Sequence, residues 1–87
     1  MNLSMRYRSK TEIIGQILAV ANGSDVTKTR IMYKAFLSFF QAKEFLTTLT
    51  ERGMLRYDEK TRTFKTTEKG LSVLQAYSEL SEFVKGI

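Results

Sequence analysis

The chain has 87 residues, which is enough for one small domain with a modest core, and its apolar fraction of 43% argues against disorder. It contains no cysteine and no histidine, which excludes disulfides, thiolate zinc sites and histidine-dependent catalysis. The 14 Lys and Arg residues outnumber the 9 Asp and Glu residues, and the net charge of +5 favours an acidic partner. We therefore expect no enzyme activity, no metal and no cofactor. No apolar run approaches the roughly 20 residues of a membrane span, so we expect no membrane partner. The absence of cysteine fits a cytoplasmic protein. No ligand pocket is apparent from the sequence, so we expect no small-molecule ligand.

The first expected element is a helix that begins after Ser9. Residues 1–8 show no periodicity and are interpreted as a frayed tail, with a basic arm carrying Arg6 and Arg8 as the alternative. The string Ser9-Lys10-Thr11-Glu12 has the spacing of a capping box, and Asn22-Gly23 ends the helix. Its apolar stripe consists of Ile13, Ile14, Ile17, Leu18, Val20 and Ala21. Val26 follows in what could be a very short strand.

Two further helices, joined by a tight turn, are predicted between Thr27 and Gly53. Thr27 caps a helix from Lys28 to about Lys34, whose buried side holds Ile31, Met32 and Ala35. Ser38 caps the next helix, at about 39–52, and Gln41 completes a second capping box. The inward positions of this helix are Ala42, Phe45, Leu46 and Leu49. A helix pair this close, on a basic chain, is typical of a helix-turn-helix.

After Gly53 the apolar period changes. Leu55, Tyr57 and Phe64 alternate with polar residues, which predicts a β-hairpin at about 55–66 with this trio on its inner face. A final helix runs from about Thr67 to Lys85, and its Leu71 and Leu74 are expected on the core. A second apolar line with the 4-3-4-3 spacing of a coiled coil predicts a homodimer interface, formed by Val73, Tyr77, Leu80, Val84 and Ile87. A lone amphipathic helix that docks on its own domain is the alternative.

Together these elements predict a mainly α fold with a small β-hairpin. The expected architecture is a winged helix-turn-helix over residues 9–70, followed by a C-terminal helix, residues 71–87, for domain packing and dimerisation. Such a fold binds double-stranded DNA with the second helix of the pair in the major groove and the hairpin along the backbone.

The candidate DNA contacts fall into three groups. Lys28, Thr29 and Arg30 open the first helix of the pair and would face a phosphate, although a solvated helix face is the alternative. On the second helix, Gln41, Lys43 and Thr47 would reach base edges, and Phe40 would contact either thymine methyl groups or a partner subunit. The hairpin would lie along the backbone through its basic residues, Arg56, Lys60, Arg62 and Lys65.

The strings SKTEIIGQIL, TKTRIMYKAFLSFFQ, ERGML and FKTTEKG resemble a small archaeal winged-helix family. That family includes a ten-kilodalton chromatin-type DNA-binding protein and predicted transcriptional regulators, and the resemblance covers roughly Ser9 to Leu80. It implies two winged heads joined by an antiparallel C-terminal coiled coil. It also implies that residues 38–47 face the groove, which adds Ser38 and Phe39 to the candidate contacts. The chain departs from the family in its shorter last helix, in Phe36 at a turn position, and in Phe40 at a usually polar position.

The leading hypothesis from the sequence is a dimeric archaeal-type transcriptional regulator that is associated with the nucleoid. One alternative is a chromatin or architectural protein without sequence specificity. Another is a winged helix used only for protein–protein assembly, which Phe39, Phe40, Glu44 and Glu51 on the second helix would support.

Overall fold

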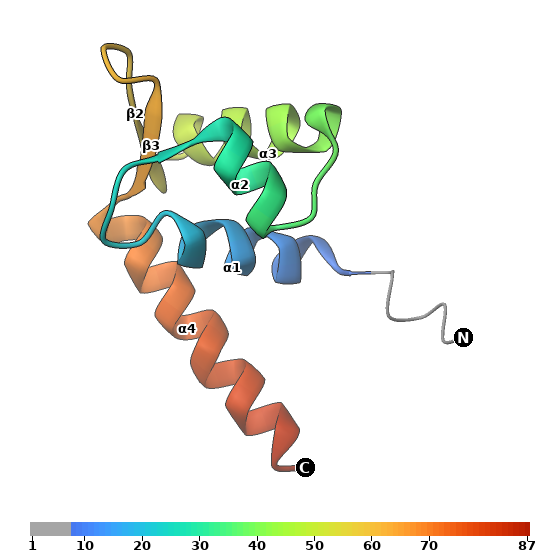
Figure 1. Cartoon of the computed structure of the whole chain (residues 1–87). Helices are drawn as coiled ribbons and strands as arrows, with labels where there is room; N and C mark the ends of the chain where they lie inside the picture. The colour runs from blue at the N-terminus through green and yellow to red at the C-terminus, as the bar shows by residue number, and fades with distance from the viewer. Residues whose placement is uncertain (1–7) are drawn as a thin grey trace.

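Four helices and one three-stranded antiparallel sheet make up the computed structural model, which describes residues 8–87 (Figure 1). The elements are α1 (Lys10–Val20), β1 (Val26–Thr27), α2 (Lys28–Lys34), α3 (Phe39–Glu51), β2 (Leu55–Asp58), β3 (Thr63–Thr66) and α4 (Glu68–Lys85). The predicted mainly α fold with a hairpin and a C-terminal helix is confirmed. Below, residues 55–66, which comprise β2, β3 and their turn, are called the wing.

Side-chain caps fix the starts of the helices, as the sequence predicts. Ser9 Oγ accepts a hydrogen bond from the Glu12 N–H at 3.1 Å, and the Ser9 N–H donates to Glu12 Oε1 at 3.0 Å. Ser38 and Gln41 form the same reciprocal pair at the start of α3. Each such cap stabilises a helix by about 1 kcal/mol. The register of α1 and α3 therefore follows from these short strings.

Helices α2 and α3 end in the same way, with a residue in the left-handed conformation. The amide that follows it returns to a carbonyl of the last turn, at 2.9 Å in both helices (Leu37 N–H to Met32 O, and Met54 N–H to Leu49 O). Gly53 supplies the left-handed residue after α3, with φ 77°, whereas Phe36 supplies it after α2, with φ 53°. A phenylalanine there is strained because its Cβ crowds the backbone. Phe36 at this turn position departs from the family pattern, and its left-handed backbone shows why another residue would be preferred there.

Replacing Phe36 by glycine is expected to raise the free energy of unfolding by about 1 kcal/mol, because the backbone strain disappears. The Phe36 side chain is 80% exposed, so little packing is lost. Urea unfolding followed by circular dichroism measures the change, with Gly53→Ala as the control that should lower stability by a similar amount. A less stable Phe36→Gly chain would mean that the Phe36 ring contributes packing.

Arg8 holds the end of α2. Its guanidinium donates to the carbonyls of Ala35 at 2.6 Å and Phe36 at 2.8 Å, and also to Gln16 Oε1. A cation at this end of the helix satisfies carbonyls that have no helical partner. The expectation of a frayed tail or a DNA-reaching arm is therefore wrong for Arg8, while Arg6 lies outside the described residues.

The core lies between α1, α2, α3 and the base of the wing (Figure 1). Its largest fully buried side chains are Ile17, Leu18, Ile31, Leu49 and Leu55. On α3, Ala42, Leu46 and Leu49 are buried as predicted, and Phe45 is partly buried. The burial of this apolar surface drives the three helices together.

The sheet has the order β1-β3-β2, so β1 adds a third strand to the hairpin. Val26 pairs with Phe64, and Leu55 pairs with Thr66. The buried Thr66 then joins the sheet to the end of α1, since its N–H donates to Ala21 O at 2.9 Å and its hydroxyl donates to Leu18 O at 2.8 Å. The base of the wing is thus fixed to the helical core, and only its tip projects.

Helix α4 begins against the end of α3. The Thr67 hydroxyl donates to Gly53 O at 2.6 Å, and Lys69 Nζ donates to Arg52 O at 2.7 Å. Gly70 is buried so closely against the wing entry that an added Cβ would lie 2.2 Å from Met54 O. The end of α3, the entry to the wing and the start of α4 are therefore held against one another at this point.

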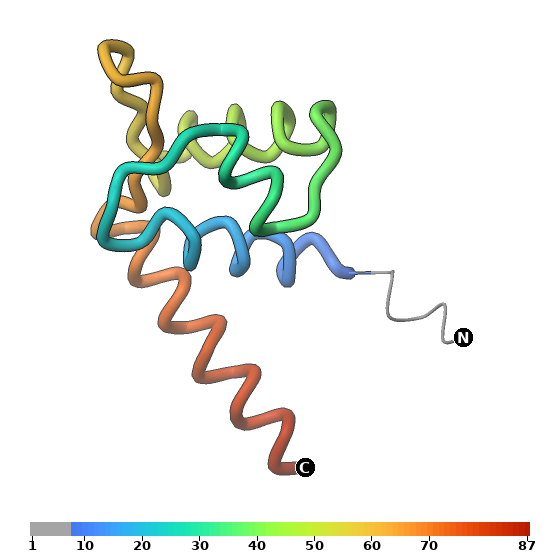
Figure 2. The backbone as a smooth tube through the Cα atoms, viewed as in Figure 1, coloured from blue at the N-terminus to red at the C-terminus, as the bar shows by residue number. Residues whose placement is uncertain are grey.

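Beyond this junction α4 crosses α1 and then projects away from the body (Figure 2). The Tyr77 ring covers Gly15 of α1, where an added Cβ would lie 2.8 Å from two ring carbons. Past Tyr77 the apolar side chains of α4 are exposed. The helix is continuous through residue 70, and the division into residues 9–70 and 71–87 stays a prediction. No helix within residues 8–87 is both long enough and apolar enough to cross a membrane.

Candidate nucleic-acid interface

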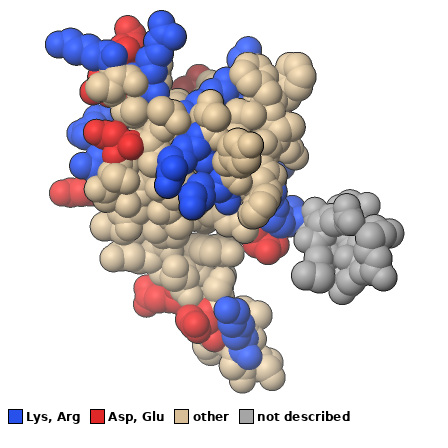
Figure 3. All heavy atoms as spheres, viewed as in Figure 1, with Lys and Arg blue, Asp and Glu red and all other residues tan. Residues whose placement is uncertain are grey.

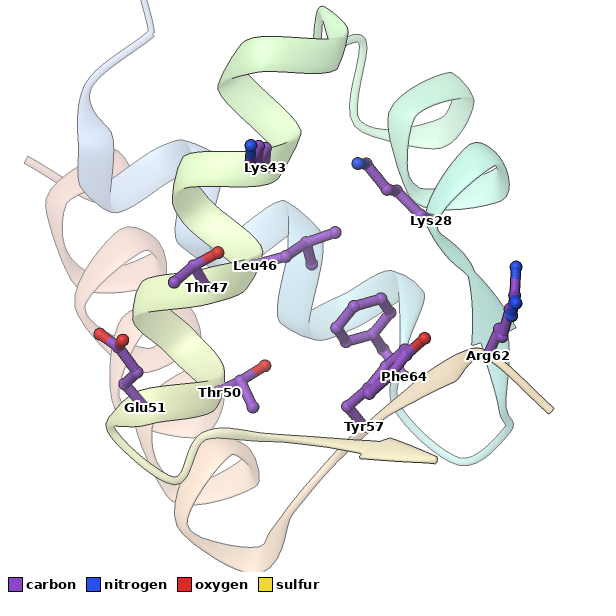
Figure 4. A pocket seen from close by; sticks show the side chains of 9 residues that line it. All are labelled: Lys28, Lys43, Leu46, Thr47, Thr50, Glu51, Tyr57, Arg62 and Phe64. Carbon is purple, nitrogen blue, oxygen red and sulfur yellow. The ribbon is translucent and has the colours of Figure 1, made fainter. Parts of the chain in front are cut away.

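A hollow of about 500 Å³ separates α3 from the inner face of the wing (Figure 4). We call it the α3–wing hollow. Its lining residues come from four elements and the wing turn: Lys28, Lys43, Leu46, Thr47, Thr50, Glu51, Tyr57, Arg62 and Phe64. The floor is apolar, because Leu46 is buried at the core and the Tyr57 and Phe64 rings pack together at a centroid distance of 4.8 Å.

Three cations converge on this hollow from separate parts of the chain. Lys28 comes from the start of α2, Lys43 from α3, and Arg62 from the turn of the wing (Figure 4). Lys28 Nζ lies 3.7 Å from the centroid of the Phe39 ring, and this cation–π contact directs its side chain toward α3. Arg62 has φ 57° and donates its N–H to Asp58 O at 2.7 Å, which closes the turn.

The outward face of α3 continues from the hollow toward the start of the helix. Phe40, Lys43 and Thr47 share this face at helical spacing and are exposed. Phe39 and Phe40 meet edge to face at a centroid distance of 5.7 Å. Lys43 and Thr47 are thus free to meet a ligand, whereas Ser38 and Gln41 are engaged with each other in the capping box.

The remaining candidates lie elsewhere. Arg56 and Lys65 are directly paired across β2 and β3, on the face of the hairpin opposite to Tyr57 and Phe64. They therefore point away from α3, as the strict alternation of the strand already implies. Lys60 is at the tip of the wing, where its N–H donates to Asp58 Oδ1 at 2.9 Å.

Thr29 and Arg30 line a separate shallow depression along α2, together with Thr27, Tyr33 and Lys34. Tyr33, near the end of α2, and Phe36, just after it, are also exposed, and neither was among the candidates from the sequence. Tyr33 lies two residues after the buried Ile31, and this helical spacing alone indicates its outward direction.

Charge is unevenly distributed over the molecule. On the face shown in Figure 3, Lys and Arg gather around α2 and the wing, whereas the projecting end of α4 carries acidic side chains next to a basic one among uncharged residues. Within residues 8–87, no group of three or more His, Cys, Asp or Glu residues could hold a metal ion. The positive end of the molecule is thus the end that carries α3 and the wing.

A helix pair with a tight turn, followed by a hairpin whose base is fixed to the core, defines a winged helix-turn-helix, which is a DNA-binding fold. The chain belongs to the winged helix-turn-helix family, whose model matches residues 7–85. It is 31% identical over 84 residues to the uncharacterized protein MJ0287 of Methanocaldococcus jannaschii, and this match covers 95% of the chain and 84% of the relative.

A solved structure has the same fold. The crystal structure of Sso10a-2, a DNA-binding protein from Sulfolobus solfataricus, matches with a TM-score of 0.82 and 23% sequence identity. The match covers 91% of this chain and 84% of that chain. The resemblance to an archaeal winged-helix family, stated from the sequence, is thereby confirmed.

Proposed function

We propose that this protein binds double-stranded DNA as a homodimer and acts as a transcriptional regulator on the nucleoid in the cytoplasm. The observation that carries this proposal is the convergence of Lys28, Lys43 and Arg62, from three separate elements, beside the outward face of α3. Sso10a-2, which has the same fold, is described as a DNA-binding protein. A basic face around an exposed helix is the usual footprint of duplex recognition.

In this proposal each contact has a physical role. Lys28, Arg62 and Lys60 meet phosphates, which supplies most of the affinity. Lys43 and Thr47 reach base edges, and Phe40 lies against thymine methyl groups. Contacts from Thr29, Arg30, Ser38, Phe39 and Gln41 stay predictions, as do those from Arg56 and Lys65. Arg56 and Lys65 would contact the DNA backbone only if the DNA passes along the outer face of the wing.

The salt dependence of binding tests the proposal. Fluorescence anisotropy compares a duplex from upstream of the gene with a scrambled duplex, from about 50 to about 300 mM salt. We expect a steep loss of affinity with salt and a preference for the upstream duplex that persists as salt rises. Equal affinities for the two duplexes would favour the architectural alternative. Absence of binding at the lowest salt would contradict the DNA-binding proposal.

A role in protein assembly alone is the second candidate, and one observation favours it. Tyr33, Phe36, Phe39 and Phe40 expose four aromatic side chains around the helix-turn-helix. Exposed aromatic side chains are more common at protein interfaces than on free surfaces, and Phe39 and Phe40 are in direct contact. Alanine at Lys28 and Arg30 separates the two candidates. DNA binding would collapse if the protein is a DNA-binding regulator, and partner binding would survive if it acts only in protein assembly.

The dimer in this proposal forms through the projecting part of α4. Leu80, Val84 and Ile87 are 60%, 57% and 90% exposed, and Val73 is 37% exposed on the same predicted line. Tyr77, the remaining residue of that line, is partly buried against α1 and would contribute less. An apolar stripe of this kind is covered in most soluble proteins.

The double change Leu80→Ser and Val84→Ser is expected to convert the dimer into a 10.0 kDa monomer, because it removes the centre of the apolar stripe. Light scattering after size exclusion measures the mass. DNA affinity should fall by about 100-fold, since the second head no longer adds to binding. Gln75→Ser, at an exposed polar position of α4, is the matched control. A wild-type chain that is monomeric at about 100 μM would contradict the dimer.

A further inference from the structure

The α3–wing hollow has the size of a small-molecule site, because such sites usually measure about 300–1,000 Å³. Its floor of Leu46, Tyr57 and Phe64 is apolar, and this is unusual on a face that meets phosphates. A DNA backbone offers charged oxygens and would leave that floor uncovered. The apolar floor therefore points to an occupant other than DNA.

A polar group inside the hollow also lacks a partner. Thr50 Oγ1 is buried and has no hydrogen-bond partner in the protein. Figure 4 draws the Thr50 side chain on the side of α3 that faces Phe64. A buried hydroxyl without a partner is uncommon, because its desolvation is not compensated. A small rotation of the Thr50 side chain toward the hollow would let a polar atom on a bound molecule supply the missing hydrogen bond.

The charged residues at the rim of the hollow favour a negatively charged ligand. Lys28, Lys43 and Arg62 lie on the rim with Glu51 as the opposing acid, so an anionic group is favoured. We propose that the α3–wing hollow binds a small amphipathic anion, with an aromatic or branched aliphatic body on the apolar floor and one acidic group at the basic rim. The sequence predicts no small-molecule ligand, because these residues are far apart along the chain and only folding brings them together.

Such a ligand would act as an effector of DNA binding, a consequence that rests on the proposed function. The acidic group would occupy Lys43 and Arg62, which otherwise meet DNA. The body of the ligand would fill the space between α3 and the wing. Ligand and duplex would therefore compete, and the ligand would release the protein from DNA.

The test is a fluorescence titration of the full chain, without DNA, with anilinonaphthalene sulfonate and its uncharged counterpart phenylnaphthylamine. We expect one site per protomer and an affinity for the sulfonate at least about 10-fold higher than for the uncharged dye. Arg62→Asn should weaken the sulfonate by about 5-fold or more, since asparagine keeps the left-handed turn and loses the charge. Lys10→Gln, with the same loss of charge at the start of α1, should leave the titration unchanged. Thr50→Phe fills the hollow and should abolish binding.

Two controls locate the dye. Phe36→Gly and Phe83→Ser remove exposed aromatic rings outside the hollow and should not alter the titration. Equal affinity for both dyes, a signal that depends on Phe36 or Phe83, or binding that survives Arg62→Asn would overturn the proposal. Arg62→Asn decides the matter if Thr50→Phe fails to fold. Because this titration contains no DNA, failure of duplex binding would leave its result intact, and competition is measured separately with labelled duplex.

Discussion

A chain that carries Lys43→Gln and Arg62→Asn is expected to bind duplex DNA about 100-fold more weakly than the wild type at about 100 mM salt. Both side chains lie on the rim of the α3–wing hollow, where α3 and the turn of the wing approach each other. Arg62 is the phosphate contact of this pair, and each lost phosphate contact reduces the steepness of log affinity against log salt by about 0.9, so the slope should become shallower by about 1 per bound protomer. Fluorescence anisotropy over a salt series measures both quantities.

The matched control for this experiment is the pair Arg56→Gln and Lys65→Gln. It removes the same charge from the same hairpin, but from the face that points away from α3. We expect less than about a 5-fold loss of affinity, because only the long-range field of the protein changes. If the control pair weakens binding as much as the first pair, the DNA lies along the outer face of the wing, and the proposed interface at α3 and the α3–wing hollow is wrong.

Gly70→Ala is expected to lower the free energy of unfolding by about 3 kcal/mol or more, which is a large part of the stability of a domain this small. The added Cβ would lie 2.2 Å from Met54 O and 2.8 Å from Thr66 Cγ2. Met54 O is a backbone atom that also accepts the Thr67 N–H at 3.1 Å, so it cannot move without breaking that bond. Urea unfolding followed by circular dichroism measures the loss.

Gly86→Ala provides the comparison, since its added Cβ would approach other atoms no closer than 3.5 Å. This change should alter stability by less than about 0.5 kcal/mol, because position 86 is at the exposed end of α4. A tolerated Gly70→Ala would mean that α4 can shift along the wing entry, which would weaken the rigid junction described above.

Local sequence signals predicted most of the fold. The capping strings at Ser9 and Ser38, the glycine at position 53 and the helical spacing on α3 each depend on residues within one or two turns. The contacts that join the elements depend on residues far apart. Arg8 is 27 residues from Ala35, and Thr66 is 48 residues from Leu18. No local pattern contains that information, because only the packed core brings those segments together.

The candidate site was predicted less well than the fold. Lys28, Lys43 and Arg62 were among the candidates, but their convergence on an apolar hollow depends on the gap between α3 and the wing. The outward direction of Arg56 and Lys65 was available from strand alternation, since the inward placement of Leu55 and Tyr57 requires it. The sequence predicts both a capping box and a base contact for Gln41, and the hydrogen bond from the Ser38 N–H to Gln41 Oε1 confirms the capping box.

The junction of Thr67, Lys69 and Gly70 with the end of α3 makes α4 a rigid extension of α3. In the proposed dimer, the rotation of one head relative to the other would then be set by the angular phase of α4. An α-helix turns by about 100° per residue, so one residue inserted after Tyr77 would swing a head to another side of the duplex. Seven inserted residues would nearly restore the phase and mainly lengthen the spacing. The length of α4 would therefore determine which distance between two binding sites along the DNA, relative to its helical repeat, the two heads of the dimer can occupy together.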